Sequence, residues 1–551
     1  MESPRNPENH RSLFPSAAVA VLAAGLSLLA AGCSQKPAAR NFILITLDTQ
    51  RADHISAYDT TFVRTPNIDS LARLGTVFKN CYSQIPITLP SHAGMFFSEP
   101  PHALKSYNNG QPILARKSRP PLAVLFKKNG FRTAAFVSLG ILEAQFGLAE
   151  GFDRYDDEFR SDRWYLTAEE INAKVLPWLE HNSRDPFFLW VHYSDPHDPY
   201  ALPDSPPDTK LYFNGRLLRD DICLNKFQSY TVEVVLEKGT NEFVFDVDNP
   251  SWGDQDNFKA RLDKIKFTSS PEITAQDIVF AKGWLHRTSD DVYFFRRRSH
   301  LQIINRGVRR TLKMLFRGKL VIPVDEMKVR YGQEVAYMDG QIGRLWQKMR
   351  DLGLFENTAV LVVGDHGEGL GEYLSSFNDR HVGHIHFLYN VYLKVPLIIY
   401  APQPKPQPQV RAETVSLLDV APTIIGMMGF RRPDFYQGRD LLRLDKDQTL
   451  TVFQETFRPE AVKDRFGVLR APWHLILTPA DNRYELFNID LDPGEQNDVF
   501  QSSSSNPEVA ALKKALEEFA RDVLSRKQKE TEAPVTDRTA EMLKSLGYVK
   551  N

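Results

Sequence analysis

The sequence predicts an α/β fold built on a large, mostly parallel β-sheet, and two patterns in the chain support that prediction. Short apolar runs rich in β-branched residues at 41–48 and 357–364 are typical of strands buried on both faces of a parallel sheet. Amphipathic stretches at 67–75 and 332–353 separate such runs, as helices do in a doubly wound sheet. Further strands are expected at 131–138, 186–193 and 395–402, and a further helix at 121–130.

The length and composition of the chain allow a large core and do not indicate a nucleic-acid partner. The 551 residues suggest one large domain with additions, or about two to three domains. The 68 Lys+Arg residues nearly balance the 69 Asp+Glu residues, so the net charge is −1 and no nucleic acid is expected as a partner. Cys81 and Cys223 make no disulfide framework, and unpaired thiols are the expectation.

Residues 1–33 are typical of the signal peptide of a bacterial lipoprotein. Arg5 and Arg11 precede an Ala-rich apolar run that stops at Cys33. We therefore expect an exported protein that a lipid on Cys33 anchors to a bacterial cell membrane, in the periplasm or at the cell surface, with 34–40 as a short tether. An uncleaved membrane anchor and a plain signal peptide are the alternatives.

Changes of pattern divide the rest of the chain. A catalytic domain is expected at 41–207 and again at 271–430, and 208–270 interrupts it. This insert alternates apolar and polar residues around Asn-Gly and Lys-Gly-Thr-Asn turns, which predicts an antiparallel β module. Whether the module binds a glycan or a partner, or has no ligand, stays open. Short antiparallel strands and a closing helix predict a smaller α+β subdomain at 431–551.

A basic stretch lies between Arg296 and Arg330. Its segment 308–320, VRRTLKMLFRGKL, is compatible with an amphipathic helix. On a lipid-anchored protein such a helix would contact anionic head groups or a polyanionic substrate. A solvated helix face without a partner is the more common explanation of such a charge run.

Several polar residues at the ends of predicted strands form a candidate catalytic site. Two carboxylates, an imidazole and a hydroxyl make a four-ligand site for one divalent cation, which would activate the hydroxyl and neutralise an anionic substrate. Two further histidines are candidates to bind ester oxygens or to protonate a leaving group. The metal ligands are Asp48, Thr88, Asp365 and His366, and the further catalytic residues are His197 and His384.

Each of these residues also has a purely structural explanation. An Asp at the end of a strand is often a helix cap or a turn residue. Thr88 precedes Pro90, and a hydroxyl just before such a proline suits the N-cap of a helix. Residue spacing does not decide between these explanations and catalysis.

Motifs in order from Asn41 to the C-terminus resemble the sulfatase family of the alkaline phosphatase superfamily. They include NFILITLDTQRADHISAY, TPNIDSLARLGTVFKNCYSQIPITLPSHAG, PFFLWVHYSDPHDPY, VLVVGDHGEGLGE and the final LKSLGYV. The resemblance implies an α/β sandwich around a large sheet with a smaller C-terminal subdomain. It also implies hydrolysis of sulfate esters with a divalent metal, usually calcium.

The same resemblance implies roles for individual residues. Asp48, Asp365 and His366 match the metal ligands of the family. His197 matches a histidine that contacts the ester, and His384 stands where a histidine often faces the leaving group.

The sequence departs from the family at the nucleophile. Sulfatases make formylglycine in the pattern Cys/Ser-x-Pro-x-Arg, and here the aligned residues are Thr88-Leu89-Pro90-Ser91-His92. Oxidation of a threonine would give a ketone rather than an aldehyde. His92 takes the place of the arginine and is the candidate substrate-binding residue. The departure is similar to lipoteichoic acid synthases, phosphoethanolamine transferases and nucleotide pyrophosphatases/phosphodiesterases, in which an unmodified threonine acts beside metals.

The sequence therefore predicts a metal-dependent hydrolase of sulfate or phosphate esters with Thr88 as nucleophile. The metal is calcium by family, and manganese or zinc suits the threonine variant. The alternatives are a phosphoryl-group transferase or phosphodiesterase that uses Thr88, and a non-catalytic protein that binds a glycan or a lipid head group.

Overall fold

A computed structural model of the chain describes residues 39–546. Its description omits 114–117, 161–162, 203–204, 227, 253–258, 288–291, 375–379, 404–407, 445–449, 458–462 and 528–534. The predicted signal peptide and most of the tether therefore lie outside the described residues. Within the described part, no helix combines the length and the apolar character needed to cross a bilayer.

The core of the molecule is an eight-stranded sheet with the order β20-β2-β19-β16-β1-β5-β3-β4. Its strands are β1 (Asn41–Leu47), β2 (Thr76–Tyr82), β3 (Arg132–Phe136), β4 (Arg154–Asp156), β5 (Phe187–Tyr193), β16 (Thr358–Gly364), β19 (Lys394–Tyr400) and β20 (Gln409–Ser416). Only β19 runs antiparallel to its neighbours among these strands. The predicted α/β fold with a large, mostly parallel sheet is confirmed.

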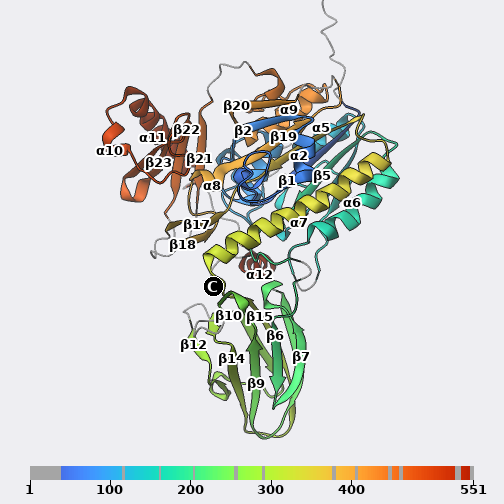
Figure 1. Cartoon of the computed structure of the whole chain (residues 1–551), viewed down its shortest axis with the longest axis vertical. Helices are drawn as coiled ribbons and strands as arrows, with labels where there is room; N and C mark the ends of the chain where they lie inside the picture. Colours follow the sequence, from blue (N-terminus) through green and yellow to red (C-terminus); the bar gives the residue numbers. More distant parts are fainter. Residues whose placement is uncertain are drawn as a thin grey trace, which may run out of the picture.

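Helices cover both faces of this sheet (Figure 1). One face carries α3 (Thr88–Phe97), α5 (Leu122–Lys128) and α9 (Val420–Met427), and the other carries α2 (Pro66–Ala72), α6 (Ala168–Asn182) and α7 (Val324–Asp351). Alternate residues of β1 serve the two cores, since Phe42 and Leu44 face the first set of helices and Ile43 and Ile45 face the second. The all-apolar strand sequences follow from this double burial.

The inserted module is a sandwich of two antiparallel five-stranded sheets, β12-β13-β10-β15-β8 and β11-β14-β9-β6-β7. Its strands are β6 (Thr209–Phe213), β7 (Arg216–Ile222), β8 (Ser229–Leu236), β9 (Gly239–Val247), β10 (Ala260–Ser269), β11 (Ile278–Phe280), β12 (Trp284–Arg287), β13 (Tyr293–Phe295), β14 (Arg298–Asn305) and β15 (Arg310–Leu320). The module projects from one end of the molecule (Figure 1). Its strands run to Leu320, past the predicted end at residue 270.

The predicted amphipathic helix at 308–320 is wrong, because this segment contains β15. Leu312, Met314 and Phe316 recur at every second position and enter the core between the two sheets. A period of two residues is that of a strand, and the basic residues between them point to the outer face.

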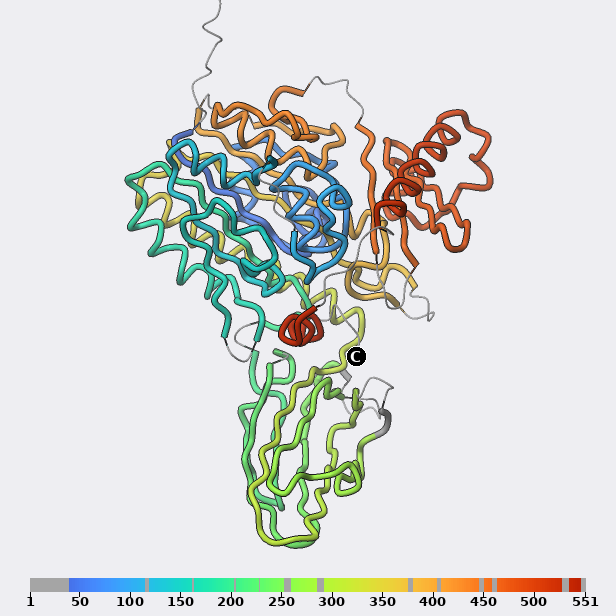
Figure 2. Tube along the Cα trace, turned by 180° about the vertical axis from the view of Figure 1, so that it is seen from behind, coloured from blue at the N-terminus to red at the C-terminus, as the bar shows by residue number. Residues whose placement is uncertain are grey.

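The C-terminal part is a four-stranded antiparallel sheet covered by a long helix. The strands β21 (Val452–Thr456), β22 (Arg465–Arg470), β23 (Trp473–Thr478) and β24 (Arg483–Asn488) follow one another in order, and α11 (Pro507–Lys527) packs on β22 and β23. The last helix, α12 (Asp537–Ser545), leaves this part and lies between the catalytic body and the β module (Figure 2). Cys81 and Cys223 are buried free thiols.

Candidate active site

The two candidate carboxylates meet because they follow neighbouring parallel strands. Leu47 of β1 pairs in register with Gly364 of β16, so the next residues, Asp48 and Asp365, leave the same edge of the sheet side by side. Ligand sites of such sheets lie beyond the carboxyl ends of the strands. Thr88 reaches the same edge as the first residue of α3.

Three of the predicted metal ligands form a compact group. One ligand atom from each of Asp48, Asp365 and His366 lies within 4.8 Å of the others, and all three residues are buried. The fourth predicted ligand joins them, since Oγ1 of Thr88 lies 3.1 Å from Nε2 of His366. The structure therefore brings the whole predicted set together.

Each of the two carboxylates keeps an oxygen without a hydrogen-bond partner among the described residues. Oδ1 of Asp48 and Oδ2 of Asp365 are buried and accept no hydrogen bond from any described residue. The other oxygen of Asp365 accepts from the backbone N–H of Thr49 at 3.1 Å and of His366 at 2.7 Å. Burial and the neighbouring charge of Asp48 raise the pKa of Asp365 well above its usual range. Two buried carboxylates with open oxygens fit a divalent cation, because that ion supplies the missing positive charge.

The histidine of the group has the form that a metal ligand requires. Burial and the nearby His384 lower the pKa of His366 to about 3, so its imidazole is neutral at pH 7. Nδ1 of His366 lies 2.9 Å from the carbonyl oxygen of Gly367. Because a carbonyl only accepts, we assign the proton to Nδ1, which leaves the lone pair of Nε2 directed to Thr88 and the carboxylates.

His197 and His384 lie beside this group, as predicted. The ring centres of His384 and His366 are 4.6 Å apart, and those of His197 and His384 are 5.3 Å apart. Nδ1 of His384 lies 2.9 Å from Oε2 of Glu368, whose other oxygen accepts from the hydroxyl of Tyr200 at 3.1 Å. Glu368 therefore fixes the orientation of the His384 ring.

The predicted N-cap role of Thr88 is wrong. The N-cap of α3 is Ile87, which makes no side-chain cap, and Thr88 is the first helical residue. A residue from another segment supplies the missing acceptor, since Oδ1 of Asn109 accepts from the N–H of Leu89 at 2.9 Å. The hydroxyl of Thr88 is thereby left to face His366.

His92 lies one turn into α3, fully buried, with Nδ1 2.8 Å from the carbonyl oxygen of Thr88 and 3.6 Å from Oδ2 of Asp365. Burial and the nearby His192 lower its pKa to about 3. His92 therefore does not supply the fixed positive charge that an arginine would supply here. It supports the backbone of Thr88.

The structure adds two residues that the sequence analysis did not select. His192 lies in the buried strand β5, and its Nε2 is 3.3 Å from Oδ2 of Asp48. A histidine within an otherwise apolar strand is the sequence feature that could have pointed to it. Burial acts to raise the pKa of Asp48, but His192, together with His197 and His366, lowers it below its usual range. Glu368 orients His384. It lies in the glycine-rich GDHGEG segment, where nothing in the sequence distinguishes it as a functional residue.

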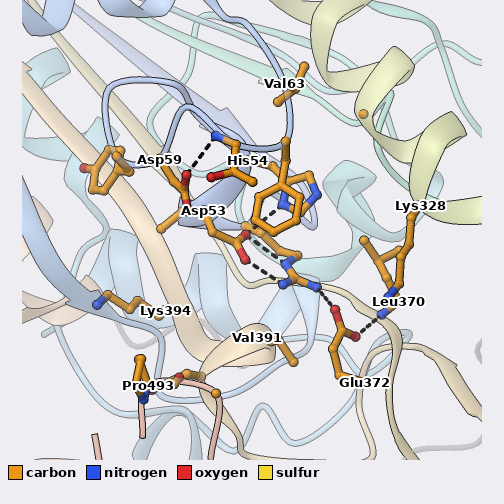
Figure 3. A pocket seen from close by; sticks show the side chains of 18 of the residues that line it. Asp53, His54, Asp59, Val63, Lys328, Leu370, Glu372, Val391, Lys394 and Pro493 are labelled. Atoms are coloured by element: carbon orange, nitrogen blue, oxygen red, sulfur yellow. Dashed lines mark hydrogen bonds and ion pairs between the residues drawn. The ribbon is translucent and has the colours of Figure 1, made fainter. Parts of the chain in front are cut away.

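A cavity of about 1010 Å³ has no candidate site residue among the residues that line it (Figure 3). Arg51 lines it and forms ion pairs with Asp53 at 2.6 Å and Glu372 at 2.5 Å. Nη1 of Arg51 also donates to the carbonyl oxygen of Glu368 at 3.2 Å. Through this hydrogen bond Arg51 connects the cavity wall to the segment that contains His366 and Glu368.

Comparisons with known proteins agree with the fold. The family model described as "Sulfatase" matches residues 40–430, and the model of the N-sulphoglucosamine sulphohydrolase C-terminal region matches 382–522. An N-acetylglucosamine-6-O-sulfatase of Bacteroides thetaiotaomicron is 24% identical over 92% of this chain and 90% of its own length. An arylsulfatase of Clostridium perfringens is 22% identical over 86% of this chain and 93% of its own length.

Solved structures show the same overall fold. A protein in complex with its substrate D-glucosamine-2-N,6-O-disulfate matches with a TM-score of 0.56, 16% identity and coverage of 89% of this chain and 99% of its own. The phosphonate monoester hydrolase of Agrobacterium radiobacter matches with a TM-score of 0.56, 16% identity and coverage of 90% and 96%.

Proposed function

The chain belongs to the sulfatase family of ester hydrolases, and from this premise we propose that it cleaves a sulfate or phosphate ester with Thr88 as the nucleophile. One observation carries the proposal. The hydroxyl of Thr88 stands at the start of α3, 3.1 Å from Nε2 of His366 and beside two buried carboxylates with open oxygens.

Asp48, Asp365, His366 and Thr88 would hold one divalent cation. Such an ion supplies positive charge that makes a bound hydroxyl more acidic and stabilises the anionic ester. Calcium suits the two carboxylates, whereas manganese or zinc suits a site that includes imidazole and hydroxyl ligands.

The residues around Thr88 account for the remaining chemistry. Thr88 gives the proton of its hydroxyl to solvent, and its Oγ1 then forms a bond to the phosphorus or sulfur atom as the bond to the leaving alcohol breaks. Nδ1 of His384 faces Glu368 and Nδ1 of His197 faces the carbonyl oxygen of Asp198, so both rings act from Nε2 in their protonated form. His384 gives the Nε2 proton to the leaving oxygen and regains it from the attacking water, and His197 donates a hydrogen bond to a non-bridging ester oxygen. Water then cleaves the ester on Thr88 and restores the hydroxyl.

The threonine favours phosphorus over sulfur. A phospho-threonine is open to attack by water, whereas a sulfo-threonine lacks the second hydroxyl through which a formylglycine hydrate expels sulfate. A phosphoryl-group transferase or phosphodiesterase is therefore the second candidate, in which an acceptor alcohol takes the place of water. The structural similarity to a phosphonate monoester hydrolase is compatible with this choice.

The direct test is a comparison of aryl sulfate with aryl phosphate mono- and diesters, each in the presence of calcium, manganese or zinc. We expect Thr88→Ala to lose turnover by at least about 10³-fold and Thr88→Ser, which keeps a hydroxyl, to retain part of it. Full activity of Thr88→Ala would remove Thr88 from the mechanism. Binding of a glycan or lipid head group without turnover of any ester would favour a non-catalytic role.

We further propose that the protein is exported and attached to a membrane by a lipid on Cys33, as its N-terminal sequence predicts. Metabolic labelling with a fatty acid should mark the protein, and Cys33→Ser should abolish the label and release the protein from membranes. A protein that stays unlabelled and is recovered in the soluble fraction would exclude the anchor.

A further inference from the structure

We propose that the outer face of the sheet β12-β13-β10-β15-β8 binds a polyanionic glycan chain that extends from the ester site. The choice of an ester-bearing glycan rests on the proposed function. Six cations define this surface, which we call the basic face: Arg261, Lys264 and Lys266 on β10, and Lys313, Arg317 and Lys319 on β15.

The strand period places these cations on one side of the sheet. On β15, Leu312, Met314 and Phe316 enter the core of the sandwich, so the residues between them point outward. On β10, Ala260 and Leu262 enter the same core, and a register shift after Leu262 brings the later basic residues to the outer face.

The basic residues of the two strands face each other in register. Arg261 pairs with Lys319, and Lys264 pairs with Arg317. Like charges directly opposite each other on a sheet destabilise it. Arg317 is only 8% exposed, burial lowers its pKa, and the nearby carboxylates of Asp263 and Glu541 act to raise it. An anion above the two strands would add to the compensation that these two carboxylates give.

The chain itself balances part of the positive charge. Asp263 pairs with Arg261 at 3.0 Å, and Glu541 of α12 pairs with Lys264. The exposed side chains of Lys266 and Lys313 form no ion pair with a described residue. The basic face therefore keeps excess positive charge toward solvent.

One end of the basic face adjoins the ester site. Nζ of Lys319 lies 2.8 Å from Oδ2 of Asp198, and the backbone oxygen of Asp198 lies 2.8 Å from Nδ1 of His197. From this end β10 and β15 run toward the far end of the module (Figure 1), and Lys264 on the way contacts Glu541 of α12. The six-residue step from Lys319 to Lys313 corresponds to about 20 Å of strand. A chain that places one ester at His197 can therefore extend over the cations.

The shape of the basic face favours a chain over a membrane. Arg317 is 8% exposed and the side chain of Lys319 is 24% exposed, so both lie below the level of Lys266 and Lys313. A flat bilayer would contact only the outer two lysines, whereas a narrow chain can lie along the paired strands and follow the row of side chains toward Lys319.

The test removes the two exposed charges and measures binding without turnover. Full-length wild type, Lys266→Gln/Lys313→Gln and the control Lys210→Gln/Lys238→Gln are titrated against a fluorescent heparin oligosaccharide at low salt. The control removes two exposed lysines from other strands and turns of the same module. We expect the first variant to bind about tenfold more weakly, with a weaker dependence on salt, and the control to bind like the wild type.

The same titration with single-stranded DNA of equal charge and with phosphatidylserine vesicles decides the ligand class. Tighter binding of either than of heparin overturns the glycan assignment. Equal loss in both double variants, or loss in neither, overturns the basic face. Turnover of the small aryl esters tests the proposed function separately: if Thr88→Ala binds heparin like the wild type while no protein cleaves an ester, the basic face stands and the proposed function fails.

Discussion

Nε2 of His366 lies 3.1 Å from Oγ1 of Thr88, although the two residues are 278 positions apart in the chain. The sheet brings them together, because β2 and β16 carry both residues to the same edge. The contact joins the start of α3 to the carboxylate group. The arrangement depends on three features: the metal site, the contact of Asn109 with the start of α3, and the close packing around Gly364.

Metal binding should stabilise the wild type and not a charge-deleted variant. Asp365→Asn removes one of two buried carboxylates that repel each other, so the metal-free variant should melt at or above the Tm of the metal-free wild type. Manganese at about 100 Kd should add about 2.7 kcal/mol to the wild type. Differential scanning fluorimetry with and without chelator measures both effects. An equal metal-induced shift in both proteins would place the ion elsewhere.

Asn109→Ala should weaken the start of α3. Its Oδ1 accepts from the N–H of Leu89, so the substitution leaves a buried helix-end donor without a partner. The expected loss of unfolding free energy is about 1 kcal/mol, and turnover should fall because Thr88 is less well fixed. Asn129→Ala, at the exposed end of α5, is the matched control. Equal turnover in the two variants would show that Asn109 does not position Thr88.

Gly364→Ala should disturb the carboxylates through the backbone. An added Cβ at Gly364 would lie 2.8 Å from the carbonyl oxygen of Gln50 and 3.0 Å from Val395, directly before Asp365. We expect loss of metal-induced stabilisation and of turnover. Gly340→Ala in α7 meets nothing within 4 Å and should instead stabilise the protein by up to about 1 kcal/mol. Denaturant titration and bound-metal analysis separate the two outcomes, and normal metal binding by Gly364→Ala would contradict the expectation.

An ion pair between the catalytic body and the C-terminal sheet should make stability depend on pH. Burial acts to lower the pKa of His102, but Glu455, 3.0 Å away, raises it above the usual histidine value of about 6.5. Because the folded pKa exceeds the unfolded one, the stabilisation is fully present below pH 6.5 and is lost as the pH rises through the folded pKa.

His102→Gln should remove this pH dependence. The difference in unfolding free energy between wild type and variant should be largest near pH 6, at roughly 1.5–3 kcal/mol, and smaller at pH 9. Urea titrations at the two pH values measure it, with His181→Gln on the exposed end of α6 as control. A difference that grows with pH would contradict the assignment of the charge to His102.

The sequence by itself determined the central sheet and the residues at its edge. Apolar runs that end in Asp48 and Asp365 leave only a doubly buried parallel sheet, and such a sheet collects the ends of its strands at one edge. The resemblance of the motif around Thr88 to the family's nucleophile pattern was likewise visible, because that motif is continuous in the chain.

Only the tertiary structure decided how these residues are supported. Asn109 rather than Thr88 caps α3, and His192 and Glu368 hold Asp48 and His384 through contacts between distant segments. The segment 308–320 became a strand because it completes the sheet beside β10, and a basic run alone does not reveal such a partner. The local sequence determines the hydrophobic period and the ends of a helix or strand. Which side chains of different helices and strands come into contact depends on how the whole chain packs.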